Sequence, residues 1–252
     1  MMRLLLPLLA VAFCVPHAAA AEPAKVIIRW HGQSFFDVES SQGTRIAFDP
    51  HAIEVYGRKL VKADLVLISH FHTDHTQLES IENVQKAKVI YGLKVAAKRV
   101  DWNIIDEQFR DVHIRTVGVY HDSEGGMRRG KTAVFVLTVD GLKIVFLGDL
   151  GHQLTEAQIR AIGPVDVLMI PVGGVYTLNG SEAKAVVAQL KPRMYILPMH
   201  YGTRVYDQLL PIDEFLDEQK KENIRLLPTT NKLTVETDFK PAEPIIAVLN
   251  WK

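Results

Sequence analysis

The sequence has almost no cysteine, since Cys14 is the one thiol among its 252 residues. This residue lies near the N-terminus, in a segment with the features of a secretory signal. A chain that loses the segment has no disulfide and no thiolate with which to bind a metal, although export leads to an oxidising compartment. The mature protein is therefore expected to contain neither.

An excess of charge of either sign is also missing. Lys and Arg together number 29, and Asp and Glu together number 29. Proteins that bind nucleic acid or acidic membrane surfaces usually carry a basic excess. The balance argues against nucleic acid and against an acidic membrane surface, and it favours a small-molecule substrate as the partner.

The apolar run at residues 4–15 is too short for a membrane-spanning helix, which needs roughly 20 residues. It follows Arg3 and precedes small residues that end at Ala21, which is the layout of a secretory signal. We predict cleavage after Ala20 or Ala21, so that residues 1–21 are the signal and residues 22–252 the mature domain. We therefore expect no stable membrane span and a periplasmic or secreted protein.

Beyond the signal, β patterns and helical patterns alternate. "ADLVLIS" is a continuous apolar run, typical of a strand covered on both faces, and "TAVFVLTVDGLKIVFLGD" predicts a hairpin with Asp140-Gly141 in a tight turn. Three helices are predicted in "TEAQIRAIG", "SEAKAVVAQLKP" and "PIDEFLDEQKKEN", with Thr155 and Ser181 as N-caps of the first two and Pro211 in the first turn of the third. Sheets with helices on their outer faces form a layered α/β architecture, and no long linker divides the chain, so one domain is expected.

The stretch "SHFHTDH" directly follows the apolar "LVLI" and concentrates imidazole and carboxylate groups in one loop. Both groups are good zinc ligands, and spacings of one and two residues let several side chains converge. The alternative is a solvated loop in which these residues cluster by accident. The motif favours His70, His72, Asp74 and His75 as metal ligands.

Four ligands cannot complete two metal sites, and three more residues are placed in the same way. His121 follows "VHIRTVGVY", Asp149 follows "KIVFLG", and His200 follows "MYILPM". Each alone would be explained as a hydrogen-bonded loop residue after a strand. Together they supply the missing ligands.

The succession "SHFHTDH", "GVYHD", "FLGDLG" and "PMHYGT" resembles the metallo-β-lactamase superfamily over nearly the whole mature chain. Further short motifs, "WHGQSFF", "FDPH" and "IPVGGVYTL", are most similar to those of the branch that includes the ascorbate-phosphate lactonases. The resemblance implies a four-layer αβ/βα sandwich with two metals at one edge. It also implies which residues hold them: one metal is held by His70, His72 and His121, the other by Asp74, His75 and His200, and Asp149 bridges both.

With two divalent cations in place, an acidified shared water would supply a metal-bridging hydroxide at neutral pH. We expect this exported enzyme to cleave a small ester, lactone or phosphoester, with Asp74 and Asp149 as catalytic residues. Asp74 would both bind metal and hold the nucleophile. Histidine-rich ligation suits zinc, whereas the two carboxylates would accommodate manganese or iron.

Other positions have weaker signals. His31, Tyr176 and Tyr201 are candidate substrate contacts, with core packing as the alternative for the two tyrosines. Asp49 either orients a ligating imidazole or only forms an Asp-Pro turn. A final group of basic residues would either meet an anionic substrate or form a solvated loop: Arg128, Arg129, Lys131 and Arg204.

Three other functions compete with this one. β-Lactamase activity would suit an exported protein. The family resemblance, however, implies that lactamases have Cys or Ser at the position of Asp149. A nuclease is disfavoured because the domain that such relatives insert is absent and the chain is not basic. A non-catalytic metal-binding or sensing protein is disfavoured because all seven ligand positions are filled.

Overall fold

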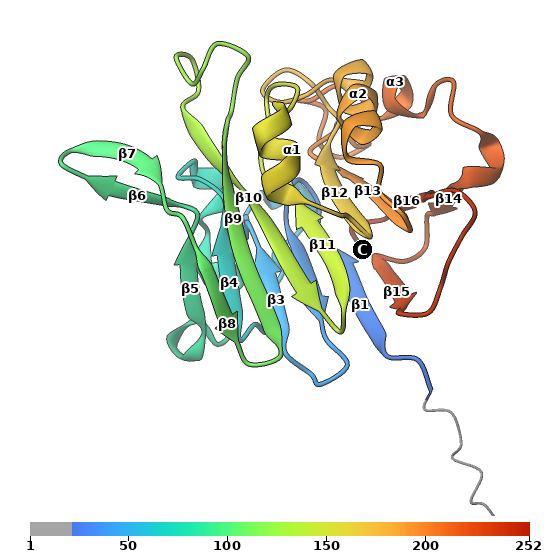
Figure 1. Ribbon diagram of the computed structural model, residues 1–252, viewed down its shortest axis with the longest axis horizontal. Helices are drawn as coiled ribbons and strands as arrows, with labels where there is room; N and C mark the ends of the chain where they lie inside the picture. The colour runs from blue at the N-terminus through green and yellow to red at the C-terminus, as the bar shows by residue number, and fades with distance from the viewer. Residues whose placement is uncertain (1–21) are drawn as a thin grey trace, which may run out of the picture.

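A computed structural model describes residues 22–252 of the protein. The predicted signal, residues 1–21, lies outside the described residues, and its removal stays a prediction. The described chain forms two large β-sheets that pack face to face (Figure 1).

The first sheet has six strands in the order β15–β1–β2–β3–β4–β5. Its β15, β1, β2 and β3 are antiparallel neighbours, whereas β3, β4 and β5 run parallel. The bounds are β1 Lys25–Trp30, β2 Phe36–Glu39, β3 Arg45–Phe48, β4 Leu65–Ile68, β5 Lys88–Tyr91 and β15 Lys232–Glu236.

The second sheet has eight strands in the order β14–β16–β13–β12–β11–β10–β9–β8. From β8 to β11 the neighbours are antiparallel, and from β11 to β14 they are parallel. Asp140 and Gly141 form the predicted hairpin turn between β10 and β11, with φ angles of 48° and 81°. The bounds are β8 Asp106–Phe109, β9 Val112–Tyr120, β10 Lys131–Val139, β11 Leu142–Phe146, β12 Val167–Pro171, β13 Tyr195–Met199, β14 Ile224–Leu227 and β16 Ile245–Leu249.

The main hydrophobic core lies between the two sheets. Phe48 of the first sheet meets Phe146 of the second, with their ring centroids 4.9 Å apart. On β4, Leu65 and Leu67 point into this core, whereas Val66 and Ile68 join a second apolar cluster on the opposite face. The strand is thus covered on both faces, as its continuous apolar run predicts.

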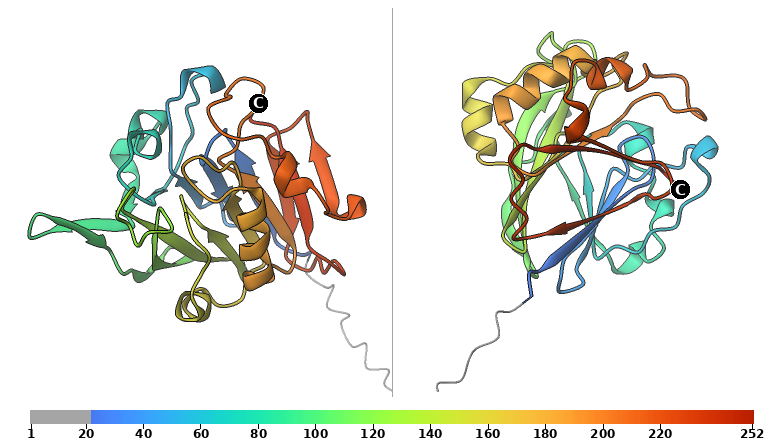
Figure 2. Two further views of the ribbon diagram at one scale, coloured as in Figure 1. Left: turned by 90° about the horizontal axis from the view of Figure 1, so that it is seen from above. Right: turned by 90° about the vertical axis from the view of Figure 1, so that its right-hand side faces the viewer.

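The outer face of the second sheet is covered by α1 (Glu156–Ile162) and α2 (Gly180–Leu190), as Figure 2 shows. The first sheet is covered by 3₁₀ turns instead of long helices: η1 Glu54–Tyr56, η2 Thr73–His75, η3 Leu78–Ser80 and η4 Val84–Lys86. Leu78 of η3 and Val84 of η4 pack on that sheet together with Ile81, which lies between the two turns. The predicted four-layer α/β sandwich is therefore present, with one layer made of such turns.

The helix ends agree with the sequence in one case and differ in two. Thr155 caps α1, as predicted, through a capping box with Gln158. The cap of α2 is Asn179 and not Ser181, because the Asn179 side chain accepts the Glu182 backbone N–H at 2.8 Å. The third helix, α3 (Asp213–Leu216), begins after Pro211 and ends early because Asp217 has extended backbone angles; η5 (Lys221–Asn223) follows it.

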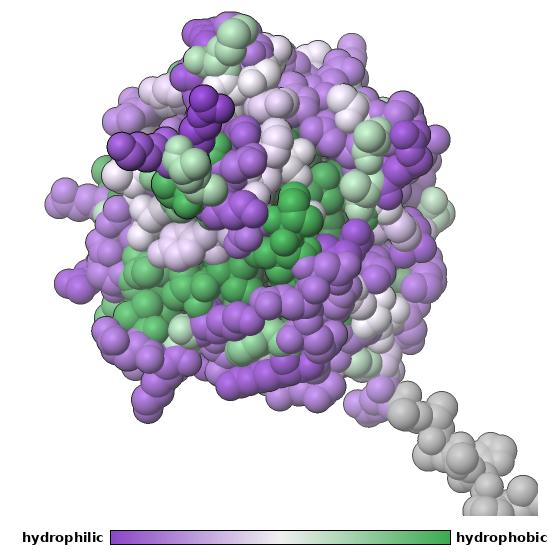
Figure 3. Space-filling model, turned by 60° about the vertical axis from the view of Figure 1, so that its left-hand side comes forward, coloured by the Kyte–Doolittle hydropathy of each residue, from purple (hydrophilic) through white to green (hydrophobic). Residues whose placement is uncertain are grey.

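A two-stranded hairpin, β6 (Leu93–Ala96) and β7 (Arg99–Trp102), projects from the body of the molecule and was not predicted. Val95 and Val100 on this hairpin are exposed. With this side turned forward, Figure 3 shows a band of hydrophobic residues bordered by polar ones.

Within residues 22–252, no helix combines the length and apolar character needed to cross a bilayer.

Candidate metal centre

Four of the predicted ligands lie in the loop that follows β4. His70 and His72 come directly after the strand, and the 3₁₀ turn η2 brings Asp74 and His75 back toward them. His70 and His75 are buried, whereas His72 is exposed and Asp74 is half-buried. One loop of the first sheet therefore presents four candidate ligands at the same edge.

The other three candidates follow strands of the second sheet. His121 follows β9, Asp149 lies three residues after β11, and His200 follows β13. These three strands point in the same direction, so their C-terminal ends meet at one edge. All three side chains are at most 2% exposed.

Two glycines permit the close approach of these strand ends. A Cβ at Gly151 would lie 2.5 Å from the His121 carbonyl carbon, and a Cβ at Gly173 would lie 2.3 Å from the His200 carbonyl oxygen. His200 itself has a φ of 51°, a left-handed conformation that costs roughly 1–2 kcal/mol for a residue other than glycine. The quoted motifs "GDLG" and "PVGG" thus place glycine where backbone must pass behind a ligand.

Asp149 occupies the centre of the cluster. Its Oδ2 lies 3.2 Å from Nε2 of His121 and 3.3 Å from Nε2 of both His75 and His200. The same oxygen lies 3.9 Å from Nε2 of His70. A single carboxylate oxygen is therefore shared by imidazoles that come from both sheets.

Around this carboxylate, the candidate ligands fall into two groups. Within each group, the candidate ligand atoms lie within 4.8 Å of one another; one group is His70, His72 and His121, and the other is Asp74, His75 and His200. This is the division that the sequence resemblance implies. The structure thus brings together all seven residues that were predicted from motifs spread along the chain.

Unpaired ring nitrogens are a second observation in favour of a metal ion at this cluster. Nε2 of His75 is completely buried and lies 3.3 Å from Asp149 Oδ2, but it forms no hydrogen bond among the described residues; Nδ1 of His121 is also unpaired. A buried nitrogen without a partner costs free energy. A cation bound at the His75 nitrogen would remove that cost.

Asp49 lies behind the ligands and fixes two of them. It accepts the Ser69 hydroxyl at 2.5 Å and His75 Nδ1–H at 2.9 Å through Oδ2, and the Ser69 backbone N–H at 2.7 Å through Oδ1. The Ser69 oxygen in turn accepts Nδ1–H of His70 at 2.9 Å. These contacts turn Nε2 of both histidines toward the cluster, where Nε2 of His70 lies 3.0 Å from Nδ1 of His72. Asp49 also belongs to a third group of possible ligands, with His70 and His75, but its oxygens are already used by these donors.

The charges in the cluster compensate one another. Burial would raise the pKa of Asp149, but attraction to His200 and His75 outweighs it and holds that pKa well below its usual range. Burial lowers the pKa of both His70 and His72. For His75, burial acts downward, but Asp149 and the neighbouring carboxylates raise its pKa well above the usual value. Asp149 is thus ionised, and His70 and His72 are neutral, which are the forms that bind metals; His75 must release a proton to do so.

Sequence reasoning missed three polar neighbours of the ligands. Gln33 donates to Asp74 Oδ2 at 3.0 Å, Ser34 donates to Asp149 Oδ1 at 3.4 Å, and Thr177 lies 3.5 Å from His200 Nδ1. Gln33 and Ser34 lie within "WHGQSFF", and Thr177 within "IPVGGVYTL". Both motifs carried the family resemblance, and that was the available signal.

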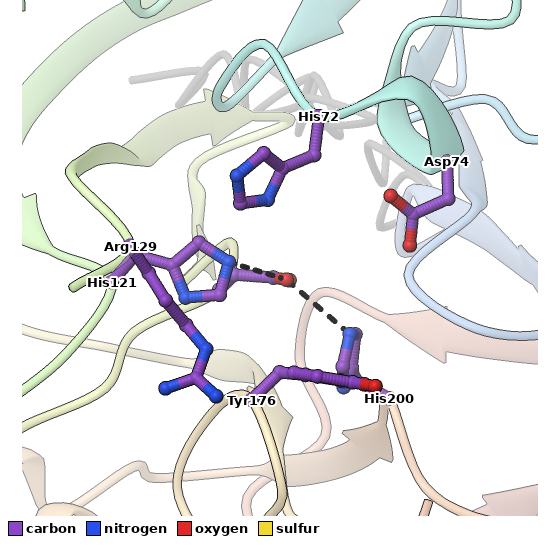
Figure 4. Close-up of a pocket in the computed structure, with 7 residues that line it drawn as sticks. His72, Asp74, His121, Arg129, Tyr176 and His200 are labelled. Atoms are coloured by element: carbon purple, nitrogen blue, oxygen red, sulfur yellow. Dashed lines mark ion pairs between the residues drawn. The ribbon is translucent and has the colours of Figure 1, made fainter. Parts of the chain in front are cut away.

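A cavity of about 380 Å³ opens onto the cluster, and Figure 4 shows its lining. Dashed lines in the figure join His121 and His200 to the shared carboxylate. The seven lining residues are His72, Asp74, His121, Arg129, Asp149, Tyr176 and His200. Tyr176, one of the candidate substrate contacts, therefore borders the same space as the candidate ligands.

The structure places the other two candidate substrate contacts elsewhere. His31 is buried and its Nε2 donates to Asp37 Oδ1 at 2.6 Å, next to the Asp37–Arg29 ion pair. Tyr201 is 5% exposed and stacks on Trp30, with 5.3 Å between ring centroids. Neither residue lines the 380 Å³ cavity, because His31 is held by a carboxylate and Tyr201 packs in the core.

Comparison with known proteins agrees with a metal site on this fold. The model of the Beta-lactamase superfamily domain matches residues 27–200. A UPF0173 metal-dependent hydrolase from Thermococcus onnurineus is 30% identical over an alignment of 195 residues, and the match covers 71% of this chain and 85% of the relative. A UPF0173 protein from Pyrococcus furiosus is 29% identical over an alignment of 211 residues, and the match covers 79% of this chain and 93% of the relative.

Two solved structures are similar as well. A Thermotoga maritima protein, assigned as a Zn-dependent hydrolase of the metallo-β-lactamase superfamily, is 33% identical, with a TM-score of 0.65 over 88% of this chain and 97% of that one. Igni18, a metallo hydrolase from Ignicoccus hospitalis, is 22% identical, with a TM-score of 0.61 over 86% of this chain and 100% of that one. The second likeness concerns the fold alone.

Proposed function

Since the chain belongs to the metallo-β-lactamase superfamily and is a metal-dependent hydrolase, we propose that it holds two divalent cations and cleaves a small ester, lactone or phosphoester. One observation carries the proposal. A single carboxylate oxygen, Oδ2 of Asp149, lies 3.2–3.3 Å from three imidazole nitrogens contributed by both sheets. A carboxylate in this position can bridge two cations.

The ligand assignment follows the two groups of side chains. One cation would be held by His70, His72 and His121, and the other by Asp74, His75 and His200, with Asp149 between them. When bound, such cations supply Lewis acidity and lower the pKa of a bound water to about 7. Five imidazoles against two carboxylates favour zinc, and manganese or iron would be accommodated by the carboxylates.

The chain's own residues would orient the reactants. Asp74 faces the cavity and is held by the Gln33 amide at 3.0 Å, which leaves its other oxygen available to accept a proton from water. Tyr176 forms part of the opposite lining. The buried side chains of His121, Asp149 and His200 form the base of the cavity.

The site supports this function over the alternatives. A β-lactamase is disfavoured because a carboxylate, Asp149, stands where the sequence resemblance places Cys or Ser in lactamases. A purified sample that hydrolysed a chromogenic cephalosporin at ordinary enzymatic rates would reverse this ranking. A non-catalytic metal-binding protein would bind the cations but release no product from any ester, lactone or phosphoester tested.

The proposal extends to the site of action, which we expect to be the periplasm or the exterior of the cell. Its support is the signal-like segment at residues 1–21. N-terminal sequencing of protein recovered from its natural host should begin after Ala20 or Ala21. Recovery of an intact N-terminus from the cytoplasm would contradict export.

The decisive experiment compares two isosteric substitutions of buried aspartates. Asp149→Asn should lower the metal content from two ions per chain to below one and reduce kcat/KM more than about 100-fold, because the bridging charge is lost. Asp166→Asn is the control: Asp166 is also buried and pairs with Arg193 at 2.8 Å, away from the cavity. Elemental analysis and a panel of lactones, thioesters and phosphodiesters provide the readouts. Full activity in Asp149→Asn would refute the proposal.

A further inference from the structure

The loop between β9 and β10, together with the first residue of β10, carries a basic run in which one member lacks the ion pair that its neighbours form. Arg128 pairs with Glu124 at 3.3 Å, and Lys131 pairs with Asp101 at 2.7 Å. Arg129 has no carboxylate partner among residues 22–252, and its guanidinium donates to a backbone carbonyl oxygen instead. Its charge is therefore not neutralised locally by the part of the chain that the structure describes.

Neutral groups hold the Arg129 side chain at the cavity. One guanidinium nitrogen, Nη2, donates to the Val175 carbonyl oxygen at 3.0 Å, and the guanidinium lies over the Tyr176 ring, 5.2 Å from its centroid. A guanidinium has five N–H donors. Only one of them has an acceptor among the described residues, so most of its hydrogen-bonding capacity remains unused beside the cavity (Figure 4).

The backbone that carries Arg129 is held in place. The Asp122 carboxylate accepts the backbone N–H groups of Glu124, Gly126, Arg128 and Arg129 at 2.7–3.0 Å. Asp122 directly follows His121, one of the proposed ligands. Arg129 is therefore held next to the metal centre both at its backbone N–H and at its guanidinium. A donor that is already held in place loses less conformational entropy when it binds a ligand.

Charge and geometry point to an anionic ligand. Two divalent cations would outweigh the two carboxylates that line the cavity, and Arg129 adds to this positive excess. A planar guanidinium suits the bidentate recognition of carboxylate and phosphate oxygens. Its position on the rim, with Tyr176 beside it, allows contact with a group remote from the bond that is cleaved.

We propose that Arg129 binds an oxyanion, a carboxylate or phosphate group, on the substrate at a distance from the scissile bond, and that Tyr176 forms the wall beside it. The proposal rests on the proposed hydrolase function. It assigns the natural substrate to the anionic esters, lactones or phosphoesters.

The test uses three 4-nitrophenyl esters, those of succinate (a free carboxylate), 3-phosphonopropionate (a free phosphonate) and butyrate (no charge). In the metal-loaded protein, Arg129→Gln should raise KM about tenfold or more for an anionic ester and leave the butyrate ester unchanged. Arg129→Lys should have an intermediate effect, because the charge is kept and the fork is lost. Arg128→Gln, a control on the same loop, should behave as wild type. The larger of the two anionic effects identifies carboxylate or phosphate as the preferred group.

A binding measurement separates this inference from the hydrolase proposal. N-phenylsuccinamate carries the carboxylate but an amide in place of the ester, and calorimetry should show its Kd rising about tenfold in Arg129→Gln. If wild type hydrolysed none of the three esters while the Kd still depended on Arg129, the ester part of the hydrolase proposal would fail and the anion site would stand. An equal Kd in both proteins, or an equal effect on the charged and neutral esters, would overturn the role of Arg129.

Discussion

Asp49 shows at the residue scale how a carboxylate outside the ligand set can control a metal site. The sequence left two interpretations, a turn before Pro50 and a partner for a ligating imidazole. Asp49 accepts hydrogen bonds from His75 and Ser69 and has a φ of 43°. It therefore serves the backbone turn and the histidine together.

We predict that Asp49→Asn weakens metal binding about 10- to 100-fold while the fold is kept, because an amide cannot accept the same set of donors. Competition with a chelator of known affinity measures the change. Asp37→Asn is the matched control, since Asp37 is also buried and pairs with a histidine, His31, away from the cavity. Equal metal affinity in both variants and in wild type would contradict the proposed role of Asp49.

Asp122 acts at the scale of an element, because it organises the whole loop between β9 and β10. Burial alone would raise its pKa, but the four backbone N–H groups that it accepts outweigh this and lower the pKa to about 2. A carboxyl whose pKa falls on folding stabilises the folded state above its ordinary pKa of 3.8. This stabilisation is lost as the pH falls toward 2.

We predict that Asp122→Ala lowers the free energy of unfolding by about 1–3 kcal/mol, as measured by urea denaturation. The amides of Glu124, Gly126, Arg128 and Arg129 should then exchange hydrogen faster. Asp101→Ala, which removes an exposed ion pair with Lys131 next to the same loop, should lower the free energy of unfolding by less than Asp122→Ala does, because exposed ion pairs contribute little to stability. Unchanged exchange at the four amides would show that the loop does not depend on Asp122.

The elements also show which parts of the site the sequence could predict. His121, Asp149 and His200 were recognisable because each follows an apolar strand, and the end of a strand is a local feature. The contacts of Gln33 with Asp74 and of Ser34 with Asp149 join residues 41 and 115 positions apart. Such contacts depend on strand order, which no local pattern contains. Asn179 and Ser181 are both residue types that cap helices, so the true start of α2 could not be read from composition.

At the scale of the whole molecule, the proposed cations would connect the two sheets. His70, His72, Asp74 and His75 come from the first sheet, whereas His121, Asp149 and His200 come from the second. A ligand that binds only the folded state stabilises it by an amount that grows with its concentration relative to Kd. Metal loading should therefore strengthen the packing of one sheet on the other.

We predict that removal of metal by a chelator lowers the Tm by about 10 °C. This follows from about 4 kcal/mol of binding stabilisation at 1,000 times Kd and about 2–4 °C per kcal/mol for a chain of this size. Calorimetry measures the shift, and adding zinc back should restore the original Tm. A Tm that did not respond to either treatment would mean that the sheets are not joined through the metal centre.

The projecting β6–β7 hairpin has a consequence of its own. Its turn, at Ala97 and Lys98 with φ angles of 49° and 63°, separates the four ligands of one sheet from the three of the other along the chain. A polypeptide severed at this solvent-facing turn would leave each fragment with an incomplete coordination sphere. Only reassociation of the two fragments would rebuild it. A chain divided at this turn could therefore serve as a split reporter in which metal binding measures the association of the fragments.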